Sequence, residues 1–350
     1  MRTKTRTERT DKMNDTVQYV CLTLDEAAEL LCQRRNTLIL FHHNPDGDAA
    51  GSAFALKAFL DSVGVRAYCI CPDEMPERLK FISDGLQESV LESSVPENFE
   101  PDIIVSVDSA SPSQLGALFE SYEGRIDLMI DHHGKGTPYA DNHVVPTASS
   151  CGEVLFSIIE AAAERLGVEI SLRVKSLIYT AISSDTGCFR YSNVQPSTHN
   201  VAARLIADGV NSADINHKLF GMKSLKQMQV EHAGFERMNF YHGGRLAIIT
   251  FPHDLKVQYG AENENLETLI DVARCIKGVE VAAVIKQPEA ENRFRVSMRS
   301  SCDIDVSEIC AMYGGGGHVR AAGCTISADS ILSAEMTIVL AVEDKLIEKQ

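Results

Sequence analysis

The stretch TLILFHHNPDGDAAGS, Thr37–Ser52, decides the fold of the first half of the chain. Its first residues are apolar or β-branched and predict a buried strand, Thr37–Phe41. Its last residues begin a pattern that predicts a helix, Ala49–Val63. Between the two lies a polar turn with two histidines and two aspartates. A strand, a polar turn and a helix in this order are typical of a parallel α/β sheet.

The same alternation of short apolar runs and helical patterns continues along the first half. The further strands that we expect are Val65–Ile70, Asp102–Val107 and Ile126–Ile130, and the further helices are Cys151–Leu166 and Leu172–Ile182. Three of the four strands are followed at once by acidic or imidazole side chains. Because ligands bind beyond the carboxyl ends of parallel strands, we expect these polar clusters to meet at one edge of the sheet.

The order of elements changes after a charged helical stretch at residues 223–243. The elements expected beyond it are the strand Arg245–Phe251, the helix Leu266–Lys277, a hairpin of Val279–Lys286 and Arg293–Ser300, a short helix, the strand Cys324–Ser327 and a closing helix. A hairpin among such elements indicates a mixed sheet. We therefore predict an α/β protein with a mostly parallel N-terminal domain, a smaller C-terminal α/β domain and a cleft between them. The expected boundaries are 1–16 for a disordered extension, 17–222 for the first domain, 223–243 for a helical linker and 244–350 for the second domain.

Composition restricts the class of protein. The 350 residues carry a formal net charge of −16, which is a poor match to a protein that coats long nucleic acid. A small anionic substrate is compatible with this charge if metal ions neutralise its phosphates. No run approaches the roughly 18 apolar residues of a membrane helix. The 10 cysteines include no CxxC pair, which argues against a zinc site and favours reduced thiols in the cytoplasm.

Six side chains at the predicted sheet edge are candidate metal ligands. They are His42, Asp46, Asp48, Asp108, His132 and Asp185. Imidazole and carboxylate ligands without thiolate favour Mn²⁺, with Mg²⁺, Zn²⁺, Fe²⁺ or another divalent ion as alternatives. Two such ions could share a water and bind a phosphate between them. The alternative is that these are solvated loop residues, and that Asp185 belongs to a helix end closed by Gly187.

Two motifs of the second domain are candidates for binding an anion. The run GGGGH, Gly314–His318, could present backbone N–H groups to an anion, or could be a flexible connector. The stretch RFRVSMRSS alternates, so that Arg293, Arg295, Ser297 and Arg299 share one face. This face could bind phosphate through arginine, or could belong to an ordinary half-exposed strand.

Together these motifs resemble a known family. HHNPDGDAAGS, VSVDSAS, IDHHG and SSDTGCFRYSN stand in the order of the four motifs of the DHH phosphoesterases. RVSMRSS and GGGGHVRAAGC resemble the DHH-associated C-terminal domain. The resemblance covers roughly residues 36–327 and is greatest to the NanoRNase/pAp phosphatase (NrnA) type. The sequence also resembles the stand-alone cyclic-dinucleotide phosphodiesterases.

The resemblance implies a role for each motif residue. His42 and Asp46 would bind one Mn²⁺ ion, Asp48, His132 and Asp185 the other, and Asp108 both. His133 would contact the scissile phosphate, with Asp131 beside it. The substrate's far end would be held by Arg299, by Gly315, Gly316 and Gly317 of the Gly314–Gly317 run, and by His318. The resemblance gives no role to His43 or to the basic N-terminal residues.

The residues and the resemblance both indicate a metal-dependent phosphoesterase in which a metal-bound hydroxide attacks phosphorus in line. The expected substrates are short RNA oligonucleotides, linear dinucleotides such as pApA, and 3′-phosphoadenosine 5′-phosphate (pAp). The alternatives are a cyclic-di-AMP phosphodiesterase, an inorganic polyphosphatase or pyrophosphatase, a nucleotide-binding regulator without catalysis, and a RecJ-like exonuclease. The motifs leave open whether the chain forms a homodimer.

Overall fold

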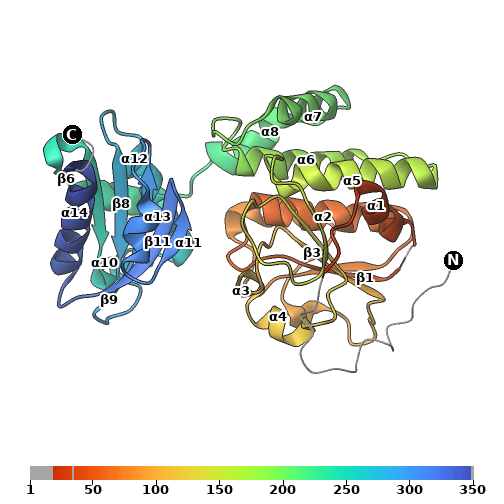
Figure 1. Cartoon of the computed structure of the whole chain (residues 1–350), viewed down its shortest axis with the longest axis horizontal. Helices are drawn as coiled ribbons and strands as arrows, with labels where there is room; N and C mark the ends of the chain where they lie inside the picture. The colour runs from red at the N-terminus through yellow and green to blue at the C-terminus, as the bar shows by residue number, and fades with distance from the viewer. Residues whose placement is uncertain (1–18, 34, 348–350) are drawn as a thin grey trace. The chain divides into compact units, whose positions relative to one another are not determined.

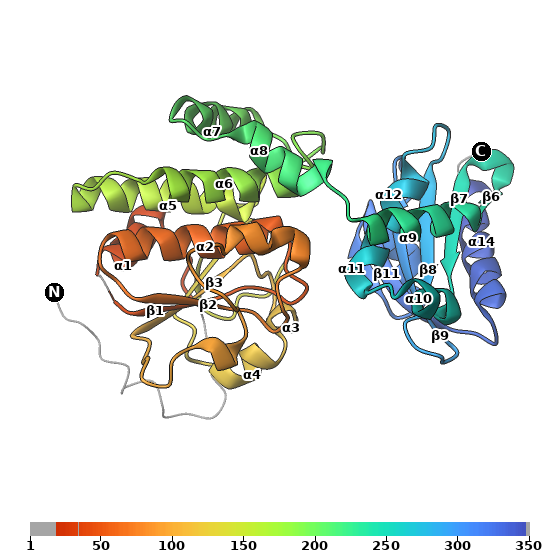
Figure 2. The ribbon, with the colours of Figure 1, turned by 180° about the vertical axis from the view of Figure 1, so that it is seen from behind.

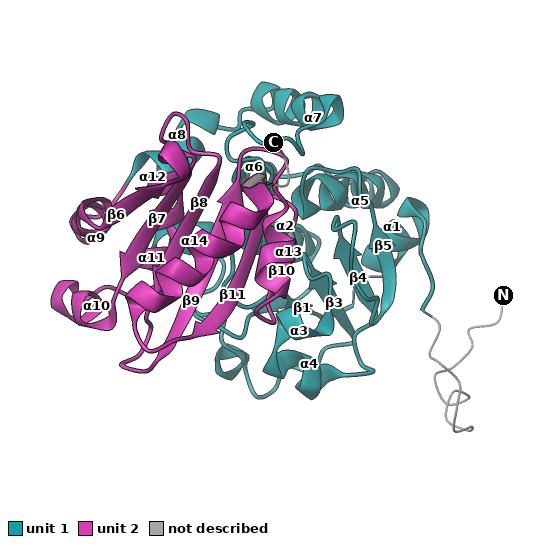
Figure 3. Ribbon diagram, turned by 60° about the vertical axis from the view of Figure 1, so that its left-hand side comes forward, with its two compact units in different colours: residues 1–222 teal, residues 223–350 magenta. Residues whose placement is uncertain are grey.

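The computed structural model describes residues 19–33 and 35–347, and the chain divides between Met222 and Lys223 into two compact units (Figure 3). The expected extension, residues 1–16, lies outside the described residues. Among those described, no helix is both long and apolar enough to cross a bilayer.

Unit 1 is built on a parallel sheet of five strands in the order β2-β1-β3-β4-β5. Its strands are β1 (Thr37–Leu40), β2 (Ala67–Ile70), β3 (Ile103–Val107), β4 (Leu128–Asp131) and β5 (Asp141–Val144). Its helices are α1 (Leu24–Cys32), α2 (Gly47–Ser62), α3 (Pro112–Leu115), α4 (Ala117–Tyr122), α5 (Cys151–Leu166), α6 (Leu172–Asp185), α7 (Pro196–Ala207) and α8 (Ser212–Asn216). The chain runs outward from β1 to β2 and then returns to β3 on the other side of β1. The order of strands therefore reverses between β1 and β3, which is where open parallel sheets place their ligands.

The two faces of this sheet are covered by different helices. Alternate residues of β1 point to opposite faces, so that Ile39 packs with α1, α2, α5 and α6, whereas Leu38 and Leu40 pack with α3 and α4. Figures 1 and 2 show α2 between the sheet and the layer formed by α5 and α6. Because α2 is covered on both sides, nearly all of its residues are buried. Its first turn, which carries Asp48, is thus fixed beside the carboxyl end of β1.

Unit 2 is built on a mixed sheet in the order β10-β11-β9-β8-β7-β6, in which only β7 and β8 are parallel. Its strands are β6 (Met238–Tyr241), β7 (Leu246–Phe251), β8 (Val281–Lys286), β9 (Arg293–Ser300), β10 (Gly316–His318) and β11 (Ala321–Ser327). Its helices are α9 (Leu225–Glu236), α10 (His253–Tyr259), α11 (Asn263–Glu267), α12 (Leu269–Arg274), α13 (Val306–Ala311) and α14 (Ile331–Ile347). Helices α13 and α14 pack on one face of the sheet, and α9, α11 and α12 cover β7 and β8 on the other.

The predicted fold class is confirmed, with local differences. The expected hairpin is formed by β8 and β9, and the second sheet is mixed. The expected helix Leu266–Lys277 is instead two short helices that meet at Thr268. The expected linker holds α9 and β6, both of which pack within unit 2. The predicted domain boundaries and the predicted cleft stay predictions.

Candidate metal centre

The register of the sheet sets His42, Asp108 and Asp131 side by side. Leu40 pairs with Ser106 and Val107 pairs with Ile130 in parallel register. His42, two residues beyond Leu40, therefore lies level with Asp108, which lies level with Asp131. The backbone of Asp108 has a φ of 53°, an unusual conformation for a residue other than glycine, and its N–H donates to the carbonyl oxygen of Ile130 at 3.0 Å. This conformation lies at the strand end where a ligand would be bound, a common place for such strain.

The carboxylate of Asp108 lies between two histidines. Its Oδ2 is 3.6 Å from His42 Nε2, and its Oδ1 is 3.6 Å from His132 Nε2 and 3.8 Å from His133 Nδ1. These distances exceed those of normal hydrogen bonds. Oδ1 is buried and has no hydrogen-bond partner among the described residues. A buried carboxylate oxygen without a partner is costly, which indicates that a cation completes this site.

Asp46 and Asp48 are held by the ends of two helices. Asp46 caps the N-terminus of α2, where its Oδ1 accepts from the N–H groups of Asp48 at 2.9 Å and Ala49 at 3.0 Å. Asp48 accepts from the N–H groups of Cys151 at 2.7 Å and Gly152 at 2.9 Å, at the N-terminus of α5. The helix dipole stabilises a negative charge there. Gly152 is required for this contact, because a Cβ atom on it would lie 2.5 Å from Cβ of Ala181.

The two metal-facing histidines are oriented by backbone carbonyl groups. His42 Nδ1 lies 2.7 Å from the carbonyl oxygen of His43, and His132 Nδ1 lies 3.4 Å from that of Ala148. In both rings the other nitrogen, Nε2, faces the carboxylates. A carbonyl at Nδ1 selects the tautomer with a free Nε2 lone pair, which is the form that binds a metal.

The ligand atoms gather in overlapping groups. His42, Asp46 and Asp108 form one group, and Asp48, His132 and Asp185 form a second, each with ligand atoms within 4.8 Å of one another. A third group, whose ligand atoms also lie within 4.8 Å of one another, consists of Asp108, Asp131, His132 and His133. The structure thus brings together all the candidate metal ligands and both neighbours in the DHH triplet. In the described part of the chain, no lysine or arginine pairs with any of these aspartates.

Crowding of carboxylates perturbs the ionisation of the site. Burial, and then the nearby charges of Asp46 and Asp108, raise the pKa of Asp185 to about 8. Burial also raises the pKa of Asp48, and Asp108 and Asp185 add to this effect. Burial alone would lower the pKa of His42, but the carboxylates of Asp108 and Asp46 raise it to about 10. The protein without ions therefore holds protons where cations would otherwise balance the charge.

His133 is held differently from its neighbour. Its Nδ1 is 2.7 Å from Oδ1 of Asp131, which also accepts from the N–H of His132 at 2.8 Å. Burial alone would lower the pKa of His133, but Asp131 raises it to about 9. Asp131 is buried, and its Oδ1 holds the ring of His133, whereas its Oδ2 has no hydrogen-bond partner among the described residues.

Several contributors to the site were not predicted from the sequence. Asn193 donates from Nδ2 to Oδ2 of Asp185 at 3.1 Å and to the carbonyl oxygen of Ser149 at 2.8 Å. Ser52 donates to Oδ1 of Asp48 at 3.1 Å. The SSDTGCFRYSN motif includes Asn193, but its spacing from Asp185 gave no indication of this contact. His43 has a structural contact, since its N–H and its Nδ1 each lie 2.8 Å from the carbonyl oxygen of Gln114.

The candidate substrate-binding residues lie in unit 2. Arg299 is on β9, where its Nη1 donates to the carbonyl oxygen of Met298 at 3.0 Å. Gly316–His318 form β10 rather than a loop, and pair with β11. The N–H groups of Gly314 and Gly315 donate to the carbonyl oxygens of Ala311 and Cys310 at the end of α13, at 3.1 and 2.9 Å. These two N–H groups are thus already paired, contrary to the idea that the whole glycine run faces an anion.

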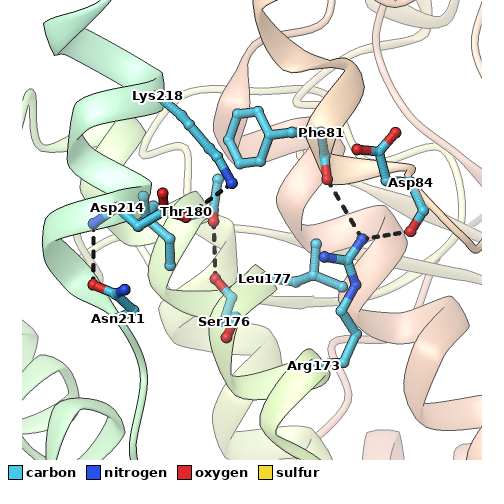
Figure 4. A pocket seen from close by; sticks show the side chains of 10 residues that line it. Phe81, Asp84, Arg173, Ser176, Leu177, Thr180, Asn211, Asp214 and Lys218 are labelled. Carbon is cyan, nitrogen blue, oxygen red and sulfur yellow. Dashed lines mark hydrogen bonds and ion pairs between the residues drawn. The ribbon is translucent and has the colours of Figure 1, made fainter.

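A separate cavity of about 230 Å³ lies in unit 1 beside α6 and α8 (Figure 4). Arg173 points into it, but its Nη2 donates to the carbonyl oxygens of Ile82 at 2.8 Å and Asp84 at 3.0 Å. Lys218 is paired with Asp214 at 2.8 Å. Because both cations are already partnered, this cavity has the character of a structural gap between helices.

Comparison with known proteins agrees with this geometry. The model of the DHH family, N-terminal domain, matches residues 36–182, and that of the DHHA1 domain matches residues 246–346. The chain therefore contains an N-terminal domain of the DHH family and a DHHA1 domain. The first match begins at β1 and ends within α6, so that it includes every candidate metal ligand except Asp185, which follows three residues later. The second match spans Arg299 and the glycine run. The family predicted from the motifs is therefore confirmed.

Individual DHH proteins align along nearly the whole chain. The bifunctional oligoribonuclease and PAP phosphatase NrnA of Thermus thermophilus is 29% identical over 309 residues, which are 88% of this chain and 89% of that protein. The cyclic-di-AMP phosphodiesterase GdpP of Geobacillus thermodenitrificans is 23% identical, over 90% of this chain but only 48% of its own length. The crystal structure of an exopolyphosphatase-related protein from Bacteroides fragilis superimposes with a TM-score of 0.83 at 23% identity, over 93% of this chain and 98% of that one, and so shares the fold.

Proposed function

We propose that the chain is a metal-dependent phosphoesterase that hydrolyses short RNA oligonucleotides and linear dinucleotides such as pApA to mononucleotides, and pAp to AMP. The observation that carries this proposal is the position of Asp108. Its Oδ2 lies beside His42, whereas its Oδ1, which is buried and has no hydrogen-bond partner among the described residues, lies beside His132. The two oxygens thus face the two groups of candidate ligands. The full-length alignment with NrnA supports the choice of substrates. The alignment with GdpP supports cyclic-di-AMP as the second candidate substrate.

The donor set fits two divalent ions. Ligands that share an ion at ~2.0–2.2 Å lie roughly 3.0–3.6 Å apart, close to the spacings between the histidine nitrogens and the Asp108 oxygens. His42 and Asp46 would hold one ion, Asp48, His132 and Asp185 the other, and Asp108 both. We propose Mn²⁺, because the donors are oxygen and imidazole nitrogen. Cys151 is excluded as a ligand, since burial raises the pKa of its thiol and its Sγ donates to the carbonyl oxygen of Ile130.

When bound, the ions would lower the pKa of a water molecule and neutralise charge that develops on the phosphoryl oxygens. The protein's own residues position the substrate and supply a proton. In the protein without ions, Asp131 raises the pKa of His133 to about 9, and we propose that this ring donates a proton to a phosphoryl or leaving-group oxygen. Asp131 fixes the orientation of that ring through the 2.7 Å contact. We propose that Arg299, the backbone of Gly316 and Gly317, and His318 bind the part of the substrate remote from the scissile phosphate. Gly315, whose N–H donates to the carbonyl oxygen of Cys310, would support this segment.

The proposal is tested by a panel of substrates at saturating Mn²⁺. The panel contains pAp, pApA, an RNA trimer, cyclic-di-AMP and pyrophosphate. We expect rapid hydrolysis of the first three and slow hydrolysis of the last two. Preferential hydrolysis of cyclic-di-AMP would favour the second candidate, and binding of all ligands without turnover would contradict catalysis.

We also propose a cytoplasmic location, because all ten cysteines are free thiols.

A further inference from the structure

One face of the unit 2 sheet carries a row of three arginines, of which the proposed function uses only Arg299. On β9, Phe294, Val296 and Met298 point into the apolar cluster beneath α13 and α14. The alternate residues Arg293, Arg295, Ser297 and Arg299 therefore share the other face, and we call them the arginine ladder. The apolar cluster on that face holds residues of β7 and β8 but, among the described residues, none of β9, β10 or β11. The helices that cover β7 and β8 do not extend this apolar packing over the ladder.

The outer two arginines of the ladder have no partner within residues 19–33 and 35–347. Arg293 and Arg295 are exposed, and no described residue forms an ion pair or a side-chain hydrogen bond with either. The residues opposite them on β11 are Ser327 and Thr325, which are neutral and exposed. On the other side Arg295 faces Lys286, whose charge is balanced by Glu267 at 2.6 Å. The strands β9, β10 and β11 contain no acidic residue. These strands thus carry arginine without an acidic residue of their own, and the nearest acids along the chain are Glu289 and Glu291 in the turn before Arg293.

The spacing of the ladder suits a ligand with repeated negative charges. Residues two apart on an antiparallel strand are separated by ~6.8 Å, so that the ladder presents a polar group at each such interval. Stacked nucleotides rise only ~3.4 Å each, so that the ladder fits a single strand that is extended rather than stacked. A guanidinium can bind two phosphate oxygens at once. Strands β9 and β11 place no aromatic side chain on this face, and Phe251 of β7 is fully buried there, so that bases would not be held by stacking.

We propose that the arginine ladder binds the phosphodiester backbone of an oligonucleotide beyond its first two nucleotides, with Arg295 and Arg293 each contacting one phosphate. The ladder thereby sets the length of RNA that the enzyme prefers, independently of base sequence. This inference rests on the proposed function for its substrate class. It assigns a role to Arg293 and Arg295, whereas Arg299 is already proposed to bind every substrate.

The test compares an RNA pentamer with pAp in the full-length protein and in the variants Arg293→Gln and Arg295→Gln. Binding of fluorescent pentamer is measured by anisotropy in EDTA at several salt concentrations. Each phosphate contact on single-stranded nucleic acid contributes about −0.7 to the slope of log K against log salt concentration. We expect each substitution to reduce the slope by about 0.7, and to weaken binding about three- to tenfold at low salt. In hydrolysis, the ratio of kcat/KM for pentamer to kcat/KM for pAp should fall by a similar factor.

Arg237→Gln is the matched control. Arg237 is exposed, lies in unit 2 and directly precedes β6, at the opposite edge of the sheet from β10. Its substitution changes the net charge equally and should leave the slope and the ratio unaltered. An unchanged slope in both ladder variants, or equal losses for pentamer and pAp, would overturn the inference. If the wild-type protein hydrolyses neither substrate, the proposed function fails, and the salt dependence in EDTA still decides whether the ladder binds RNA.

Discussion

Addition of Mn²⁺ to the metal-free protein should release about two protons per chain at pH 7. The pKa of His42 is raised to about 10 and that of Asp185 to about 8, so that at pH 7 the first is almost fully protonated and the second about nine-tenths protonated. Metal ions require a neutral imidazole and an ionised carboxylate, so that both protons must leave on binding.

The sign of the pH dependence follows from the same ionisations. Protons compete with the ions, so that affinity rises as pH increases through about 8, where Asp185 ionises, and then through about 10, where His42 loses its proton. The number of protons released should fall from about two at pH 7 to about one at pH 9, because Asp185 is by then largely ionised before the metal binds.

Isothermal titration calorimetry in buffers with different ionisation enthalpies measures this number directly. The variant Asp185→Asn should release about one proton fewer than the wild type at pH 7. Asp254→Asn is the control, since Asp254 is exposed on α10 in unit 2 and should leave the number unaltered. Release of less than about half a proton at pH 7, or the same release at pH 7 and pH 9, would refute the reasoning.

Four substitutions test other parts of the account. His132→Ala and Asp108→Ala should each lower Mn²⁺-dependent kcat by about 10²–10³ or more. The control His232→Ala, at an exposed histidine, should leave kcat unaltered. Near-normal activity of either site variant would contradict the assignment of His132 and Asp108 as metal ligands. Gly152→Ala should lower the free energy of unfolding, measured with denaturant, by about 1–3 kcal/mol, because the added Cβ would lie 2.5 Å from Cβ of Ala181. An unchanged denaturation midpoint would show that α5 and α6 can move apart at little cost. Glu153→Gln should lower the free energy of unfolding by about 1–3 kcal/mol at pH 7. The reason is that the buried carboxylate accepts hydrogen bonds from the hydroxyls of Ser149 at 2.7 Å and Thr198 at 3.0 Å. Burial opposes ionisation of Glu153, but these hydrogen bonds lower its pKa overall. The difference from the wild type should therefore be lost as the pH falls through this lowered pKa, and a difference that persists in more acidic solution would argue for a packing effect.

The sequence was sufficient to predict the strand ends and the residues that follow them. Apolar runs encode β1, β3 and β4, and the rule that ligands bind at the carboxyl ends of parallel strands then connects His42, Asp108 and His132. The structure adds the strand order, which reverses between β1 and β3. The edge strand β5 was missed, because its sequence DNHV lacks the apolar pattern of a buried strand. Glycine-rich β10 was missed for a similar reason, since a glycine run favours flexible turns.

Long-range contacts to the ligands could not be predicted from local patterns. Asp48 accepts from N–H groups that lie 103 and 104 residues away, at the start of α5. Local spacing does not encode such a pairing, which depends on how α2 and α5 pack. Gly47 has a related explanation: a Cβ atom on it would lie 2.5 Å from Oγ of Ser184 on α6, so that the glycine makes room for a helix distant in sequence.

The central claim is that one cluster of side chains holds two divalent ions that share Asp108. A crystal structure of the Mn²⁺-loaded protein, with an anomalous difference map for manganese, tests it most directly. The account predicts two peaks ~3.5–4 Å apart, one beside His42 and Asp46 and the other beside His132 and Asp185, with a carboxylate oxygen of Asp108 bound to each. A single peak, or two peaks of which neither is bound to Asp108, would contradict it.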